Sequence, residues 1–335
     1  MTGHRRLSYL GAIAATCALV AAAAGLASRD HSSPRNPLAH LRFLVDPQTP
    51  AAAEAKAHLA AGDREDAALM RQIARRPTAT WLGGTAPEAR RAAAGLAWRG
   101  ARVGAAPIMV LYAIPDRDCG GASSGGAATA GQYRAWVHAV ASGIGPRRAV
   151  VIVEPDATSH IASKCVPAAT ATQREALLAY AITDLKRRTR AAVYLDAGNA
   201  GWIAARDMVP VLQRAGIRRA DGFAVNVGNF YTTTQSRRYG HMLSRMLRGK
   251  HFVVDTSRNG NGPYVGPLAP QWCNPPRRAL GAAPTTRTGD RSLDALLWIK
   301  YPGASDGSCR PGEPPAGAWW PEYALGLVRA SRGSR

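Results

Sequence analysis

The chain has 335 residues, of which 46% are hydrophobic and 19% are charged, so it can bury a large core and is neither a disordered chain nor a repeat array. Its formal net charge is +21. The arginines are scattered along the chain without a dense block beside aromatic residues, which argues against a nucleic-acid partner and leaves attraction to an acidic surface as the better reading.

The N-terminal residues 1–27 have the pattern of an export signal. His4, Arg5 and Arg6 precede an apolar run that extends over 7–26, as in a signal peptide, and the run is also about long enough to remain as an uncleaved membrane anchor. Residues 28–43 are polar and contain proline, which predicts a linker. We therefore expect one exported domain over 44–332, secreted or held at the cell envelope, that meets a membrane only through this anchor.

The cysteines fit an oxidising compartment. Once Cys17 is lost with the export segment, four remain, at Cys119, Cys165, Cys273 and Cys309, and this even number predicts two disulfides. Among the three possible pairings, the sequential one closes the shortest loops. The spacing lacks the close pairs of a zinc ribbon, so we predict no metal site.

The folded body opens with an alanine-rich segment of helical spacing at 51–76, followed by a short strand at 80–82. Apolar runs of strand length then alternate with helical patterns. The runs lie at 107–112, 149–153, 192–195, 222–226, 251–254 and 295–299, and the helical patterns at 133–143, 173–188 and 238–247. Strands that are apolar throughout predict parallel pairing with both faces buried. The fold class is therefore α/β, either a barrel or an open sheet.

Polar side chains recur directly after these strands. They are Asp118, Asp156, Asp196, Asn226, Asn229, Asp255, Lys300 and Asp306. A single aspartate in such a place would more often cap a loop. The repetition favours one shared pocket, because the C-terminal strand ends of a barrel converge on one face.

The residue types in this pocket indicate glycosidic cleavage by acid and base carboxyl groups, since the sequence shows no histidine cluster and no Ser-His-Asp candidate. Tryptophans beside the polar clusters could stack on sugar rings. They are Trp81, Trp202, Trp272 and Trp298, and for Trp298, inside an apolar run, packing in the core is an equal alternative.

Several long runs resemble glycoside hydrolase family 6 cellulases. The first is Tyr112-Ala113-Ile114-Pro115-Asp116-Arg117-Asp118-Cys119-Gly120 with Ser124-Gly125-Gly126 behind it, and the second is Val153-Glu154-Pro155-Asp156. Further matches follow in family order at 195–198, 255–263, 272–275 and 297–300. The resemblance covers roughly 44–330 and implies a distorted, partly open TIM-like parallel β/α barrel.

The resemblance further implies an inverting endo-β-1,4-glucanase that acts on cellulose or a related β-1,4-glucan, as a monomer and without a cofactor. Asp156 matches the general acid, whose pKa must be raised. Asp118 matches its neighbour and the indirect base, acting through a water held by Ser124, while Asp306 matches a rival base. Tyr112 would lie near the distorted central sugar, and Asp196 would stabilise positive charge at the reacting ring.

The expected substrate-binding residues are Trp81, Asn199, Trp202, Asn226, Asn229, Trp272 and Lys300. The sequential cysteine pairs, Cys119–Cys165 and Cys273–Cys309, match the two disulfides of the family. Asn199 stands where the family often has histidine, and Ala304 stands where it has glutamate, which predicts weaker binding or an altered glycan preference. Short loops favour endo-action. The alternatives are an exo-acting cellobiohydrolase and a catalytically weak glycan-binding protein of the envelope.

Overall fold

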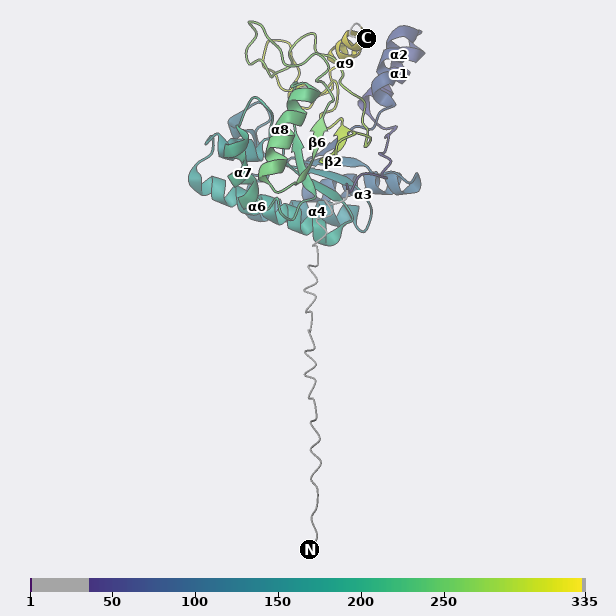
Figure 1. Ribbon diagram of the computed structural model, residues 1–335. Helices are drawn as coiled ribbons and strands as arrows, with labels where there is room; N and C mark the ends of the chain where they lie inside the picture. Colours follow the sequence, from purple (N-terminus) through teal and green to yellow (C-terminus); the bar gives the residue numbers. More distant parts are fainter. Residues whose placement is uncertain (2–35, 333–335) are drawn as a thin grey trace. The chain divides into compact units, whose positions relative to one another are not determined.

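The computed structural model describes residues 1 and 36–332 (Figure 1), and the residues from 36 onward belong to one compact unit. The predicted signal peptide or anchor, 1–27, lies outside the described residues apart from Met1. Leu38, which we expected in the linker, is fully buried and packs against the core. The folded body therefore begins before residue 44.

Seven parallel strands form one sheet in chain order. They are β1 (Thr80–Leu82), β2 (Ile108–Leu111), β3 (Val150–Val153), β4 (Ala192–Asp196), β5 (Gly222–Val225), β6 (His251–Asp255) and β7 (Leu293–Leu297). Each predicted strand is confirmed, and only the last lies two residues earlier than expected.

The sheet curls into a half-barrel whose two edges approach without pairing as strands. At this seam the Ala79 amide donates to the Trp298 carbonyl at 2.9 Å, and the Trp81 indole N–H donates to the Ile299 carbonyl at 2.8 Å. The predicted partly open parallel β/α barrel is confirmed. Because the strands run parallel, their C-terminal ends and the loops that follow them lie on one face.

Most of the helices connect the strands and pack on the outside of the sheet, whereas the first two and the last pack against one another (Figure 1). The helices are α1 (Pro50–Ala60), α2 (Arg64–Ala74), α3 (Ala86–Arg102), α4 (Ala130–Ile144), α5 (Ala157–Ala162), α6 (Ala168–Arg188), α7 (Ala205–Arg214), α8 (Thr233–Met246) and α9 (Pro321–Arg332), with a 3₁₀ turn η1 (Asp118–Gly120). None of the described helices is both long and apolar enough to cross a bilayer.

The helical segment predicted at 51–76 is two helices. Gly62 adopts a positive φ of 82°, and Asp63 then caps α2 by accepting a hydrogen bond from the Asp66 amide at 3.0 Å. Glycine enters this left-handed conformation without steric cost, and aspartate is a favoured N-cap, so both residues favour a break here.

Side chains alternate along each strand between two cores. Met109, Leu111 and their equivalents on the other strands pack under α3, α4, α6, α7 and α8, whereas Ile108, Val110 and Tyr112 point into the barrel interior. This period of two explains why the strands read as apolar throughout. A third cluster joins α1, α2 and α9, and it contains Trp298, which is 2% exposed and so is a core residue.

Candidate active site

A cleft of about 1180 Å³ lies across the C-terminal strand ends. It is lined by residues within 46–50, by residues of α3 and by the loops that follow the strands. Most of the predicted site residues line it. They are Trp81, Tyr112, Asp118, Asp156, Asn199, Trp202, Asn229, Trp272, Lys300 and Asp306. The converging strand ends thus bring together residues that are more than 200 positions apart in sequence.

Asp156 is the third residue after β3 and the N-cap of α5. Its backbone is left-handed, with a φ of 70°, and its amide donates to Asp196 Oδ2 at 3.0 Å. Burial, reinforced by the negative charge of Asp118, raises the pKa of Asp156 to about 7, although Lys300 opposes the shift. Below neutral pH this carboxyl therefore carries a proton that it could donate.

Asp118 lies in η1, at a φ of 60°, and is held by a neighbouring serine. Its Oδ2 accepts hydrogen bonds from the Ser123 amide at 2.7 Å and from the Ser123 hydroxyl at 2.8 Å. The Ser123 hydroxyl also lies 2.9 Å from the Tyr112 hydroxyl. These contacts form a chain from Tyr112 through Ser123 to Asp118 at the cleft wall.

The structure places Ser123, rather than the expected Ser124, against Asp118. Ser124 is exposed and does not line the cleft. The reason is the tight turn of the loop, in which the Ser124 amide donates to the Gly121 carbonyl at 3.1 Å while the Ser123 amide turns toward the carboxylate. Gly126 closes the loop at a φ of 101°, where an added Cβ would lie 2.0 Å from the Ile114 carbonyl oxygen.

Asp306 is tied to two cations. Its Oδ1 and Oδ2 accept from the fully buried Arg258 guanidinium at 2.9 and 3.0 Å, Lys300 Nζ lies 3.2 Å away, and the Asn274 amide donates to Oδ2 at 3.0 Å. Burial alone would raise the pKa of Asp306, but Arg258 and Lys300 hold it below its ordinary value. A carboxylate with these partners is a weak proton acceptor.

Two predicted site residues, Asp196 and Asn226, lie beneath the cleft instead of lining it. Asp196 is 1% exposed and accepts from the amides of Asp156 and Gly198. Burial, together with the Asp156 charge, raises its pKa well above the ordinary value. Asn226 is fully buried and donates to the Asp255 carbonyl at 2.9 Å. Both residues shape the loops that carry the lining side chains.

The three predicted tryptophans that line the cleft, Trp81, Trp202 and Trp272, differ in their surroundings. The rings of Trp81 and Tyr112 meet edge-on, with their centres 5.0 Å apart. Lys300 Nζ lies 5.6 Å from the centre of the Trp81 ring. Trp202 and Trp272 are 39% and 50% exposed and line the cleft, so both indole rings are open to it. Flat indole faces in a cleft with hydroxyl, amide and ammonium groups suit carbohydrate rings.

Four residues at the site were not singled out from the sequence. Glu154 is fully buried and accepts from the Ala113 and Ile114 amides, which fixes the loop after β2. Glu154 and Arg258 stood inside the runs already matched to the family, which was the available signal. The other two residues are Ser123 and His160. The turn of the loop, which the sequence did not reveal, brings Ser123 to Asp118. No sequence signal pointed to His160.

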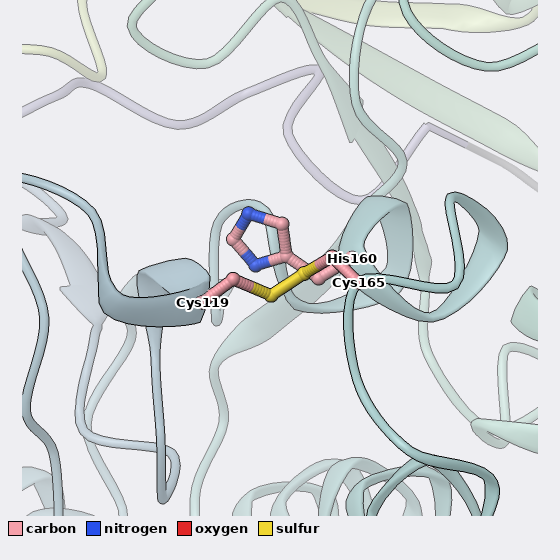
Figure 2. A group of neighbouring side chains, drawn as sticks. All are labelled: Cys119, His160 and Cys165. Carbon is pink, nitrogen blue, oxygen red and sulfur yellow. A yellow bond between two sulfur atoms is a disulfide. The ribbon is translucent and has the colours of Figure 1, made fainter.

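The disulfides Cys119–Cys165 and Cys273–Cys309 are present, as predicted. Cys119 follows Asp118, and Cys165 follows α5, whose N-cap is Asp156, so this bond ties the two carboxylate segments together. Figure 2 shows the His160 imidazole next to this disulfide. A ring nitrogen of His160 and the two sulfur atoms lie within 4.8 Å of one another. The sulfur atoms are bonded to each other and are therefore not available as metal ligands.

Replacing both Cys119 and Cys165 by serine is expected to lower the free energy of unfolding by about 2–4 kcal/mol, because the unfolded chain is no longer cross-linked. If the cleft acts on the β-glucan that the sequence predicts as substrate, the double substitution should also lower kcat at temperatures far below the Tm, because the Asp118 loop is then free to move relative to α5. Urea unfolding and initial rates at one low temperature measure the two effects. A folded variant with unchanged kcat would show that the bond has no positioning role.

Comparison with known proteins gives a consistent assignment. The sequence model described as "Glycosyl hydrolases family 6" matches residues 38–331. Endoglucanase A of Cellulomonas fimi is 42% identical over 292 residues, which are 87% of this chain and 61% of that protein, so the chain spans about three fifths of this relative. Endoglucanase 1 of Streptomyces halstedii is 40% identical, over 85% of this chain and 88% of that protein.

A solved structure is similar over the whole described fold. The endoglucanase Cel6 from Mycobacterium tuberculosis, in complex with methyl-cellobiosyl-4-deoxy-4-thio-β-D-cellobioside, has a TM-score of 0.82 and 43% sequence identity, and the match covers 88% of this chain and 99% of that one. The fold, the paired carboxyl groups in the cleft and these matches agree, and the chain belongs to glycosyl hydrolase family 6.

Proposed function

We propose that the protein is an endo-β-1,4-glucanase that hydrolyses internal bonds of cellulose or a related glucan with inversion at the anomeric carbon. The observation that carries the proposal is Asp156, a carboxyl group that keeps its proton to about pH 7 in a cleft walled by indole rings. The endoglucanase names of the relatives at 40–43% identity support the same substrate class and the internal mode of cleavage.

In the proposed mechanism Asp156 protonates the glucosidic oxygen of the leaving sugar. Burial and the Asp118 charge favour its neutral form, so the acid is ready at the pH of reaction. Asp196 lies below it, with its carboxylate on the Asp156 amide, and fixes the left-handed turn that aims the acid. The buried polar side chain of Asp196 would also stabilise the positive charge that develops on the reacting sugar ring.

Asp118 is the base in this proposal, and it acts on the attacking water through a second water. An inverting reaction needs space for water between the base and the sugar, so a base that does not touch the anomeric carbon is suitable. The Ser123 hydroxyl, and not Ser124, is the group placed to orient that water, because it joins Asp118 and Tyr112. Asp306 is the weaker candidate, because two cations and a backbone amide already engage its carboxylate.

The substrate is proposed to lie on Trp81, Trp202 and Trp272, with Asn199, Asn229 and Lys300 as hydrogen-bonding groups along the cleft. Tyr112 would face the sugar nearest the acid, since it lines the cleft close enough to Asp156 for that charge to contribute to raising the pKa of Tyr112. We further propose that the protein is exported and acts as a monomer. Its catalytic domain comprises 44–332 and the few residues before them. The two disulfides suit an oxidising compartment.

The loss of viscosity of a soluble β-1,4-glucan, compared with the release of reducing ends, tests the mode of cleavage. Internal cleavage predicts a steep fall in viscosity for few bonds broken. Reducing ends that appear while the viscosity stays high would identify the exo-acting alternative. Binding without turnover on any β-glucan would identify the alternative of a glycan-binding protein.

Ala304 lines the cleft. The sequence resemblance indicates that the family has glutamate at this position. Ala304→Glu is expected to tighten the binding of cello-oligosaccharides by about tenfold or more, because a hydrogen bond from a sugar hydroxyl to a carboxylate contributes about 1.5–3 kcal/mol. Isothermal titration gives the affinity. Ala316→Glu adds the same charge elsewhere on the cleft wall and serves as the control. Equal affinity of Ala304→Glu and the parent protein would refute the idea.

A further inference from the structure

His160 lies in the wall of the cleft, one helical turn after the proposed acid. Its amide donates to the Asp156 carbonyl at 2.8 Å within α5, and its side chain lines the same cleft. The imidazole meets the indole of Trp202 edge-on, with ring centres 5.3 Å apart. His160 is therefore fixed both to the acid-bearing turn and to one of the exposed tryptophans.

The two ring nitrogens have different surroundings. Nδ1 is fully buried and has no hydrogen-bond partner among the described residues, and it is turned toward the Cys119–Cys165 disulfide in Figure 2. Nε2 lies on the other side of the ring, away from the sulfur atoms (Figure 2), and because His160 lines the cleft it is the nitrogen that can face the cleft.

The ring is uncharged over the range in which a glucanase would work. Burial, together with the positive charge of Arg174, lowers the pKa of His160 to about 4, although Asp118 opposes the shift. A neutral imidazole carries one N–H. We assign it to Nε2, because an N–H on the buried Nδ1 would have no acceptor.

We propose that His160 is a substrate-binding residue, whose Nε2–H donates a hydrogen bond to a hydroxyl of the glucosyl unit that stacks on Trp202. The disulfide at its back and the indole at its edge hold the ring in place, so the donor is directed before substrate arrives. Close packing also restricts the loop that carries Trp202, since a Cβ added to the adjacent Gly201 would overlap the Tyr231 hydroxyl. The inference rests on the proposed function, because it takes a β-1,4-glucan as the ligand.

The test uses thio-linked cello-oligosaccharides of two to six glucosyl units, which are not hydrolysed, and measures Kd by isothermal titration. His160→Phe keeps an aromatic ring against Trp202 and the disulfide but removes the donor. It is expected to raise Kd about three- to tenfold, the loss of one neutral hydrogen bond, only for ligands long enough to reach Trp202. His160→Gln restores a donor and should recover most of the affinity, while the exposed His40→Phe should change nothing.

The outcomes separate this inference from the proposed function. Unchanged Kd in His160→Phe for every ligand, or an equal loss at all lengths together with a lower Tm, would overturn the role of His160 and leave the glucanase assignment standing. A length-dependent loss with no turnover of any β-glucan by the parent protein would support the His160 contact and overturn the proposed activity. Failure of the parent protein to bind any of these ligands would overturn both.

Discussion

Replacing Asp156 by asparagine is expected to lower kcat on a soluble β-1,4-glucan by about 10²–10⁴-fold, the range that general acid catalysis contributes. The amide keeps the shape of the side chain but has no proton to give to the leaving oxygen. Binding of cello-oligosaccharides should change little, because the aromatic surfaces of the cleft remain. Initial rates of reducing-end release over a range of pH measure the effect.

The same substitution at Asp116 provides a matched control. Asp116 is exposed, also has a positive φ of 53° and stands in the same loop as Asp118, but its side chain does not line the cleft. Asp116→Asn should retain parental kcat. In the parent protein kcat should fall as pH rises through about 7, where Asp156 loses its proton. Near-parental turnover by Asp156→Asn, or activity that holds well above pH 7, would remove Asp156 from the role of acid.

The second large effect is expected for Asp118→Asn, which should lower kcat by about 10²-fold or more through the loss of the base. It should also move the alkaline limb of the pH profile to lower pH. The negative charge of Asp118 raises the pKa of Asp156, so its removal lets Asp156 ionise earlier. Azide, a small nucleophile that needs no base, should restore part of the turnover.

Asp306→Asn separates the two candidate bases. The fully buried Arg258 guanidinium then loses its carboxylate partner, and breaking a buried ion pair in this way costs about 3–5 kcal/mol of stability. The main result should be a lower midpoint of urea unfolding, without rescue by azide. If azide instead restores Asp306→Asn and has no effect on Asp118→Asn, the base is Asp306.

The fold was predictable because each strand is buried on both faces and so appears as a continuous apolar run. Helix boundaries that depend on single residues were harder to predict. The break between α1 and α2 rests on the backbone of Gly62 and the cap at Asp63, and α3 was not predicted although Thr85 and Glu88 form a capping box at its start. Closure of the barrel at the Trp81 seam depends on contacts across more than 200 residues, which no local pattern contains.

At the site, long motifs pointed to the residues to which we assign the chemistry, but not to the neighbours that contact them. Ser123 and Ser124 are adjacent, and only the φ and ψ angles of the turn decide which hydroxyl meets Asp118. The depth of Asp196 and Asn226 below the cleft is likewise a matter of tertiary packing. His160 belongs to no matched motif, and its position depends on the disulfide and on Trp202, which come from other segments.

The central claim is that Asp156 and a water-mediated base cleave a β-1,4-glucan with inversion, and the anomeric form of the fresh product tests it most directly. Proton NMR of cellotetraose or cellopentaose hydrolysis, recorded before mutarotation, reports that form. The account predicts that the newly formed reducing end appears first as the α anomer and then equilibrates. A reducing end that appears first as the β anomer would contradict it.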